Sequence, residues 1–204
     1  MTHSSQENIF VERVFKTLDV LDPAGRTLLV GGAAIAAYAQ HASLEWQHPN
    51  AINGPPFPDI DVLADEQTMV DYLTGQYGDL DEFVVQDDPY DMERKDGMAV
   101  YATPPDSSDM LRFTAFTVDE KFQQWNFRDL ASGPHEVIIL GGRRVLRPGP
   151  VLTWKALHNR PKDREVIDSV LNGPSQDLRD HIGRRTLETV ASLMDGSLGQ
   201  DALF

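Results

Sequence analysis

The sequence predicts an α/β (α+β) protein built on a mixed β-sheet with flanking helices and a C-terminal helical part. Two observations predict this class. Short apolar runs alternate with amphipathic segments up to residue 147, and only helical periodicity follows from Pro150 onward. Apolar residues make up 41% of the 204 residues, which is enough to form a core without disulfides or a structural metal.

The first predicted elements surround a pair of glycines. The spacing of apolar residues predicts an amphipathic helix over Asn8–Leu21, and an Asp-Pro-Ala-Gly turn follows it. Thr27–Val30 is predicted to form a short buried strand, which Gly31-Gly32 interrupts. Ala33–His41 is then expected to form a helix of small residues that packs closely on a sheet.

A long loop separates the glycines from a pair of acidic residues. Ser43–Pro58 contains four prolines, which exclude regular structure, and loops of this length often act as lids or binding loops. Asp59–Ala64 is predicted to form a strand in which Asp59 and Asp61 share one face, because successive side chains alternate. A helix over Glu66–Gly75 is expected to follow.

The rest of the chain is predicted to form a β-rich stretch and then helices. Gly141-Gly142, between two apolar runs, is a hairpin signal. Strands are predicted at Phe83–Gln86, Met98–Ala102, Met110–Thr117, Glu136–Leu140 and Arg143–Leu146, and helices at Lys121–Leu130, Val151–His158, Lys162–Leu171 and Gln176–Met194. We expect a core over residues 1–147, a helical region over 148–195 that packs on it, and a loose tail over 196–204.

The charge balance restricts the partners. The chain has 18 basic and 32 acidic residues, a net charge of -14, so nucleic acid is disfavoured as a partner without being excluded. The acids concentrate between Asp59 and Glu120. Basic residues gather from Arg143 onward, as solvated helix faces or as a face that holds a triphosphate or an RNA end. Because the chain lacks cysteine, a signal-peptide pattern and a membrane-spanning apolar run, we expect a cytoplasmic protein with no membrane partner.

The order of strand, Gly-Gly, helix, loop and Asp-x-Asp strand is the pattern that indicates chemistry. Backbone amides at Gly31 and Gly32 can approach a phosphate closely, and the helix N-terminus adds a partial positive charge. Asp59 and Asp61 can hold Mg²⁺, which prefers carboxylates together with substrate phosphates. We therefore predict a nucleotide phosphate on the glycines and Mg²⁺ on the two aspartates.

These two motifs resemble those of the nucleotidyltransferase superfamily, in which a strand ends in Gly-Gly or Gly-Ser and a later strand carries Asp-hydrophobic-Asp-hydrophobic. Here they are Leu28–Gly32 and Asp59–Val62. The resemblance implies a nucleoside triphosphate as substrate, with Asp59 and Asp61 as catalytic metal ligands. It also implies transfer of a nucleoside monophosphate to an acceptor of unknown identity, such as an RNA end, a protein side chain or a small molecule.

A second block resembles the C-terminal motif of bacterial relatives of AbiEii-type toxins. It comprises Arg147–Leu157 and the stretch Arg160 to Asp163. The resemblance implies that Lys155 contacts the nucleotide phosphates as a catalytic and binding residue, that Arg160 belongs to the nucleotide site, and that Asp163 organises it. One version is the toxin of a toxin–antitoxin pair, with an antitoxin protein as partner. The competing interpretation is a surface lysine and ordinary ion pairs within a helix.

The pattern departs from the family where a third carboxylate is expected. On the predicted strand Met110–Thr117 the polar position is Thr114, and threonine cannot act as a general base. Asp109 at the start of this strand, or Asp119 or Glu120 at its end, is an alternative third carboxylate, and spacing does not choose among them. Two functions therefore stay open: a Mg²⁺-dependent nucleotidyltransferase, or a catalytically degenerate protein of the same fold that binds a partner. Nucleotide titration with Mg²⁺ distinguishes them.

Two histidines and two tryptophans near the motifs are weaker candidates. His48 and His158 are candidates for ligand contact, and Trp46 and Trp125 for stacking on a base. Because the histidines form no metal-binding pair, packing is the simpler interpretation of all four residues.

Overall fold

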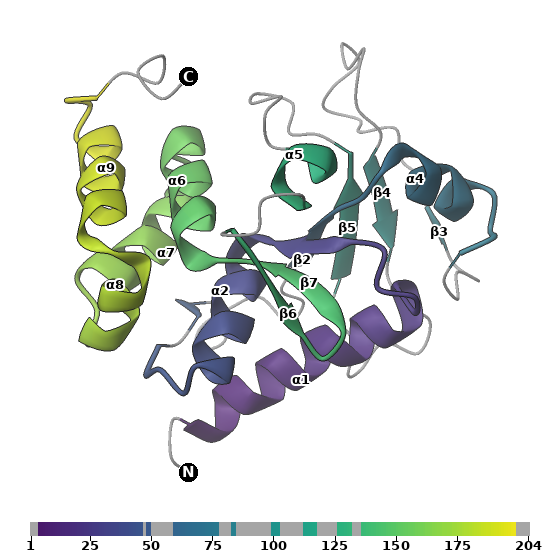
Figure 1. Cartoon of the computed structure of the whole chain (residues 1–204), viewed down its shortest axis with the longest axis horizontal. Helices are drawn as coiled ribbons and strands as arrows, with labels where there is room; N and C mark the ends of the chain where they lie inside the picture. Colours follow the sequence, from purple (N-terminus) through teal and green to yellow (C-terminus); the bar gives the residue numbers. More distant parts are fainter. Residues whose placement is uncertain are drawn as a thin grey trace.

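The computed structural model describes residues 4–46, 48–49, 59–77, 83–84, 99–102, 112–117, 126–131 and 136–198. Within these ranges the chain forms a seven-stranded sheet in the order β3-β4-β5-β2-β1-β7-β6 (Figure 1). The sheet is mixed, because β1 pairs antiparallel with β2 and parallel with β7, and β2 pairs parallel with β5. The predicted α/β class is confirmed. The strands are β1 (Leu28–Val30), β2 (Asp59–Leu63), β3 (Phe83–Val84), β4 (Ala99–Ala102), β5 (Arg112–Phe116), β6 (Val137–Leu140) and β7 (Arg143–Leu146).

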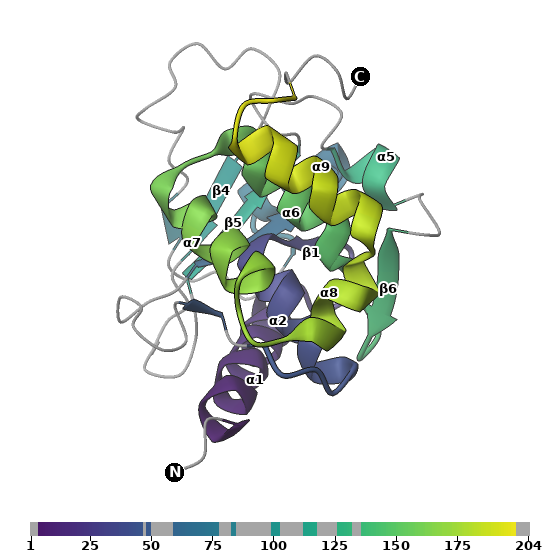
Figure 2. The same cartoon turned by 90° about the vertical axis from the view of Figure 1, so that its left-hand side faces the viewer.

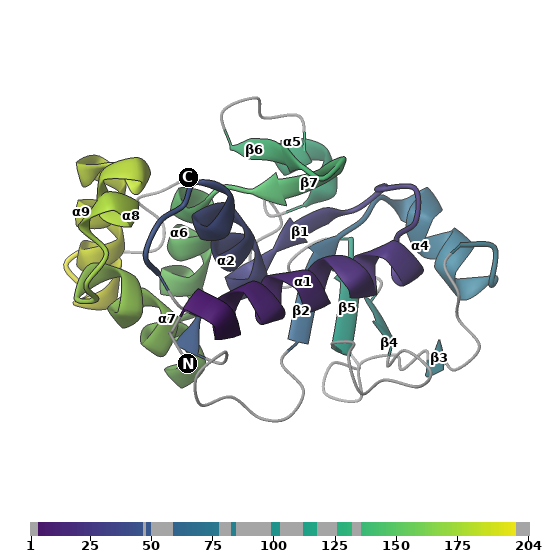
Figure 3. The same cartoon turned by 90° about the horizontal axis from the view of Figure 1, so that it is seen from below.

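The N-terminal helix lies on one face of the sheet, and the C-terminal helices gather at one side of it. In Figure 3, α1 runs across one face of the sheet. Helices α6 to α9 lie together near α2, far from β3 and β4 (Figures 1 and 2). No helix in the described part of the chain has both the length and the apolar character of a membrane span. The helices are α1 (Ser4–Leu21), α2 (Gly31–His41), α4 (Glu66–Leu73), α5 (Phe127–Ala131), α6 (Pro148–His158), α7 (Pro161–Leu171), α8 (Gln176–Ile182) and α9 (Arg184–Met194).

The central strands are fully buried, as the continuous apolar run of β1 predicts. Leu28 to Val30 in β1 and Ile60 and Val62 in β2 have almost no exposed surface. The cluster of buried apolar side chains that contains them includes α1 and α2 and continues into α6, α7 and α9. The hydrophobic core therefore extends without a break from the sheet into the C-terminal helices.

A buried aspartate fixes the turn between α1 and β1. The Asp22 carboxylate accepts hydrogen bonds from the Arg26 backbone N–H at 2.8 Å, from the Thr27 hydroxyl at 2.6 Å and from the Tyr77 hydroxyl. Arg143, in β7, donates to the Asp22 carbonyl oxygen at 2.5 Å. Burial, and then the hydrogen bond to Asp22, raise the pKa of Tyr77, so its hydroxyl remains a donor. This turn sets where β1 begins and therefore where its glycine end lies.

The predicted elements agree with the structure except at some boundaries. Pairing of β6 with β7 confirms the hairpin at Gly141-Gly142. The single helix predicted over Gln176–Met194 is wrong, because Gly183, with a φ of +88°, separates α8 from α9. Helix α6 begins already at Pro148, since proline is accommodated in a first helical turn, where no amide donor is needed. Residues 121–125 of a predicted helix, and the predicted tail from residue 199, lie outside the described residues.

Candidate functional site

The candidate site is centred where β1 ends and α2 begins. Gly31, the first residue of α2, has a φ of +68°, a conformation that strongly favours glycine. The Asp61 carboxylate lies against this residue, because its Oδ2 atom is 2.8 Å from the point where a side chain at position 31 would begin. Any other residue at this position would be strained and would collide with Asp61. The glycine therefore allows a carboxylate to approach the start of a helix closely.

Strand pairing determines what lies beside Asp61. Strand β2 runs between β1 and β5, with Asp61 opposite Val30 on one side and Thr114 on the other. Adjacent strands are about 4.8 Å apart, so a carboxylate at position 114 would be a direct neighbour of Asp61. The residue there is a threonine, which accounts for the missing third acid. Asp59 opens β2 opposite Arg112, and its side chain lies outside the described part of the structure.

The N-cap residue of α2 gives that helix no side-chain cap. This residue, Val30, makes no side-chain hydrogen bond, and the first turn carries no acidic residue. By contrast, the Asp65 carboxylate caps α4 by accepting from the Thr68 backbone N–H at 2.6 Å. The first amides of a helix carry partial positive charge and need acceptors. The first turn of α2 is therefore suited to an anion.

A charged cluster on α6 and at the start of α7, which we call the Lys155 group, consists of the buried residues Lys155 and Asp163 and the exposed Arg160. Lys155 is only 8% exposed and donates to Asp163 Oδ1 at 3.0 Å, while Arg160 Nε donates to Asp163 Oδ2 at 2.6 Å. Burial acts to raise the pKa of Asp163, but Arg160 and Lys155 outweigh it and hold that pKa below its ordinary value. Because one carboxylate faces two cations, the Lys155 group carries a net positive charge.

His48 packs against Gly32 at the start of α2. Its Nε2 atom is 1.9 Å from the point where a side chain on Gly32 would begin, so the imidazole fills that space. The ring stacks on Phe10, with 5.4 Å between centroids, and meets Trp46 edge-on. Burial, and then the nearby Lys155 ammonium, lower the pKa of His48 to about 3, so the ring is neutral at pH 7.

The sequence-predicted residues thus fall into two sets. Gly31, Gly32 and Asp61 meet at the start of α2. The Lys155 group lies on α6 and at the start of α7, and α6 packs against α2. No histidine pattern marks His48 in the sequence, and its position between the Gly-Gly and Asp-x-Asp motifs is the signal that could have pointed to it.

The other candidates have structural roles. Trp46 is 3% exposed and donates to the Ser169 hydroxyl at 3.2 Å, which is a packing role and not an open stacking surface. Arg143 and Arg144 donate to backbone carbonyl oxygens in the turn between α1 and β1, so they stabilise that turn. Trp125 lies outside the described residues.

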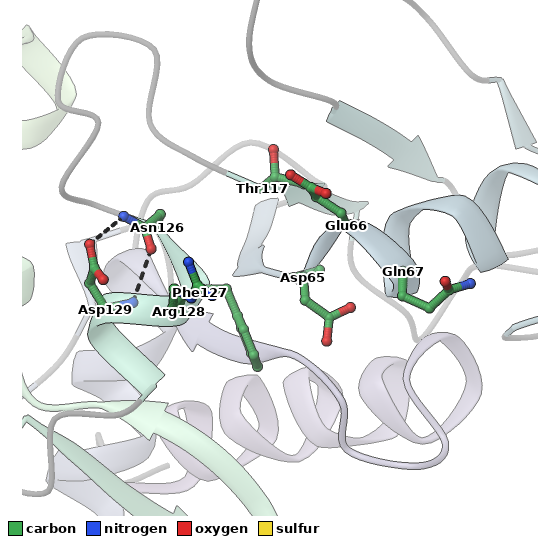
Figure 4. A pocket seen from close by; sticks show the side chains of 9 residues that line it. Asp65, Glu66, Gln67, Thr117, Asn126, Phe127, Arg128 and Asp129 are labelled. Atoms are coloured by element: carbon green, nitrogen blue, oxygen red, sulfur yellow. Dashed lines mark hydrogen bonds between the residues drawn. The ribbon is translucent and has the colours of Figure 1, made fainter.

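An open pocket lies at the opposite end of β2 (Figure 4). It has a volume of about 580 Å³, and its carboxylates outnumber its one guanidinium. Two of its polar side chains serve their own helices, since Asp65 caps α4 and Asn126 accepts from the Asp129 backbone N–H at 2.9 Å. We call this side the pocket end, and the side with Gly31, Gly32 and Asp61 the glycine end. The pocket is lined by Ala64, Asp65, Glu66, Gln67, Thr117, Asn126, Phe127, Arg128 and Asp129.

The side chains at the glycine end fit Mg²⁺ only together with a substrate. Within the described residues, no three His, Cys, Asp or Glu side chains stand close enough to hold a metal ion by themselves. Mg²⁺ in nucleotide sites is typically held by one or two carboxylates and by substrate phosphates. Asp61, beside helix amides that suit a phosphate, meets that requirement, whereas Thr114 supplies no general base.

The geometry of the glycine end is therefore the basis for a functional assignment. It combines a helix N-terminus whose N-cap residue makes no side-chain cap with a carboxylate in contact with the first glycine. Helix α6, which carries the buried Lys155, packs against the same helix. No protein-family model and no curated protein sequence matches the chain.

Proposed function

We propose that this protein is a Mg²⁺-dependent nucleotidyltransferase, which transfers a nucleoside monophosphate from a nucleoside triphosphate to an acceptor. The observation that carries the proposal is the contact between Asp61 and Gly31 at the start of α2. It sets a carboxylate suited to a metal ion beside backbone amides suited to a phosphate, so that one bound nucleotide can engage both. The resemblance of the two motifs to nucleotidyltransferases supports the same reading.

At the glycine end, the backbone amides would bind the nucleotide phosphate and the two aspartates would hold the metal ion. The first amides of α2 hold a phosphate of the nucleotide, and Gly31 and Gly32 let it approach. Asp59 and Asp61 would hold Mg²⁺, which when bound activates the attacking oxygen and stabilises the leaving pyrophosphate.

The Lys155 group neutralises phosphate charge. Asp163 holds the Lys155 ammonium at 3.0 Å, which fixes its position, and Arg160 adds a second cation. In a buried environment such charges act more strongly than they would in water. Their net positive charge would stabilise the pyrophosphate that leaves.

The reaction breaks the bond between the α-phosphorus and the pyrophosphate oxygen, and forms a bond from the acceptor oxygen to that phosphorus. The acceptor loses a proton in this step. Since Thr114, beside Asp61, cannot take this proton, it passes to solvent. We therefore expect slow transfer.

The negative charge of the protein favours a protein side chain or a small cationic molecule as the acceptor. Residues 59–120 contain 17 acidic and three basic residues, so this segment carries the entire net charge of -14. An RNA end would be repelled by that field, whereas a cationic acceptor would be attracted. In the toxin version of this function, an antitoxin protein is the expected partner.

Thr114 favours a second function, in which a catalytically degenerate protein of the same fold binds a partner protein. The residue lies directly beside Asp61, where the family places its third carboxylate. Nucleotide titration with Mg²⁺ distinguishes the two functions. Binding that disappears in Asp61→Ala would support the enzyme, whereas absence of binding of any nucleoside triphosphate would contradict it and support the partner-binding protein.

The test is incubation of the protein with each labelled nucleoside triphosphate, Mg²⁺ and cell extract, followed by detection of labelled macromolecules and small products. We expect label transfer that falls by about 100-fold or more in Asp61→Asn, the range for losing a charge-stabilising group. The matched control is Asp65→Asn, which alters an acid just beyond the opposite end of the same strand and should keep the activity. Equal loss in both variants would contradict the proposed site.

A further inference from the structure

Strand β6 is the last strand of the sheet and lies at the margin of the molecule (Figure 2). Hydrogen-bonded and non-hydrogen-bonded pairs alternate along its antiparallel ladder with β7. The Glu136 carbonyl oxygen accepts from the Arg147 N–H at 2.7 Å, which identifies the pairs that are bonded. The backbone N–H and C=O groups of Val137 and Ile139 therefore point away from β7. Within the described part of the chain, no backbone hydrogen bond beyond this ladder reaches either residue.

The strand lacks the features that normally prevent an exposed edge from pairing. Proteins protect such edges with lysine, proline or a bulge. Strand β6 reads Val-Ile-Ile-Leu, and its four residues pair consecutively with β7 without a bulge. Ile139 is 63% exposed, the highest value among the large apolar side chains of the described ranges. Strand β6 is thus an apolar edge that is open to another strand.

The edge is complementary to itself. In an antiparallel pair of β6 strands with Ile138 on a two-fold axis, Val137 of each copy lies opposite Ile139 of the other. Val137 and Ile139 carry the outward backbone groups, so these two pairs would exchange about four hydrogen bonds. Opposed side chains share a face of the sheet, and each exposed Ile139 would therefore be covered by Val137 of the other copy. Ile138, which is partly buried, would meet its own copy on the other face.

The distribution of charge favours association at this edge over the opposite one. Residues 59–120 carry the whole net charge of -14, and their strands β2 to β5 form the other end of the strand order. Residues 137–162 contain six basic residues and no acidic residue. Two copies joined at β6 would keep their acidic segments at the two far ends of one sheet, which minimises their repulsion.

The arginines beside β6 would not oppose this pairing, because both bind groups of their own chain. Arg143 forms ion pairs with Asp19 at 2.7 Å and with Asp22 at 3.5 Å. Arg144 donates to the Gly25 carbonyl oxygen at 3.1 Å. Both guanidinium groups are thus directed to the turn between α1 and β1.

We propose that β6 is a dimerisation edge, at which two copies of this chain pair their β6 strands antiparallel and join two sheets into one. The arrangement has the isologous symmetry of a two-fold dimer. A single pair of short strands buries little surface, so we expect a dissociation constant of about 1–100 µM. This inference is independent of the proposed function, because β7 separates β6 from the strand that leads to Gly31.

Sedimentation equilibrium of the full chain over a range of concentrations tests the dimer. The wild type should approach twice its mass of 22.8 kDa. Ile139→Lys sets a charge at the centre of the edge and should weaken association by about tenfold or more. Val70→Lys is the matched control, since Val70 is an exposed apolar residue of α4 at 42%, and it should associate as the wild type does. A wild type that stays monomeric up to about 1 mM would overturn the inference. Equal association of Ile139→Lys and the wild type, or an equal loss in Val70→Lys, would overturn it too.

Amide hydrogen exchange of the wild type tests the register without any substitution. On going from dilute to concentrated protein, exchange at Val137 and Ile139 should slow, because these amides become bonded to the other copy. Exchange at Ile138 and Leu140 should change little, because their amides already face β7. Unchanged exchange at Val137 and Ile139 in a dimeric sample would show that another surface associates. This measurement decides the matter should Ile139→Lys fail to fold.

Discussion

Strand β2 lies beside two helix N-termini that differ in how an acidic residue is used. At the pocket end, Asp65 lies just beyond the strand, and its carboxylate caps the first turn of α4. At the glycine end, Asp61 lies within the strand and contacts Gly31, while the N-cap residue of α2 makes no side-chain cap. An acid near a helix N-terminus is thus a structural cap in one place and a candidate metal ligand in the other.

This difference shows that an open pocket does not by itself mark the candidate site in this protein. The pocket end is open, yet two of its polar side chains are engaged in their own helices. At the glycine end, His48 fills the space beside Gly32 and the Asp61 carboxylate contacts Gly31.

The largest effect is expected from Asp163→Asn. Removing this carboxylate leaves the Lys155 ammonium buried without its charge partner, which should lower the free energy of unfolding by about 3–5 kcal/mol. Denaturant unfolding of the variant measures this loss. The double variant with Lys155→Met should recover much of it, because the uncompensated charge is gone. A loss below about 1 kcal/mol would mean that the pair behaves like a surface ion pair.

A smaller effect is expected from Gly32→Ala. The new methyl group would meet His48 Nε2 at 1.9 Å, and the packed ring cannot move away easily, so we expect destabilisation by about 1–3 kcal/mol. Gly149→Ala in α6 is the matched control, since its nearest neighbour is Thr186 Cγ2 at 3.5 Å, an ordinary contact. Thermal unfolding of both variants measures the difference. Equal stability of Gly32→Ala and Gly149→Ala would contradict the close approach of His48.

A graded effect is expected from pH. Folding lowers the pKa of His48 from its ordinary value of 6.5 to about 3, so between these pH values the imidazole is protonated in the unfolded chain but neutral in the folded protein. The stability that the neutral ring contributes is therefore fully present above pH 6.5. It is lost as pH falls toward 3, at about 1.4 kcal/mol per pH unit. The difference in unfolding free energy between wild type and His48→Gln, measured from pH 7 to 4, should show this slope. A His48 ring-proton NMR signal that titrates near pH 6.5 would rule it out.

The smallest effect is expected at the pocket end. Asp65→Ala removes the cap of α4 and should lower stability by about 1 kcal/mol, with nucleotide affinity unchanged. Asp65→Ser should restore most of the stability because serine is also a good cap. Weaker nucleotide binding in Asp65→Ala would show that the two ends are coupled.

Local sequence predicted the central strands and the strand position of Thr114 well. The apolar run of β1, the alternation in β2 and the polar position Thr114 follow from strand geometry, and the structure sets Thr114 beside Asp61. Contacts between distant segments could not be predicted in this way. The packing of His48 against Gly32 depends on α1, α2 and α7 together, and the break at Gly183 depends on how α8 and α9 meet the core.

The parallel pairing of β7 with β1 also has a consequence for biosynthesis. Leu28 and Leu29 pair with Arg144 and Val145, and α6 with Lys155 follows directly after β7. The ribosome therefore releases the glycines and Asp61 before β7 and α6. The nascent chain cannot pair β1 with β7, or bring α6 against α2, until these later segments have emerged.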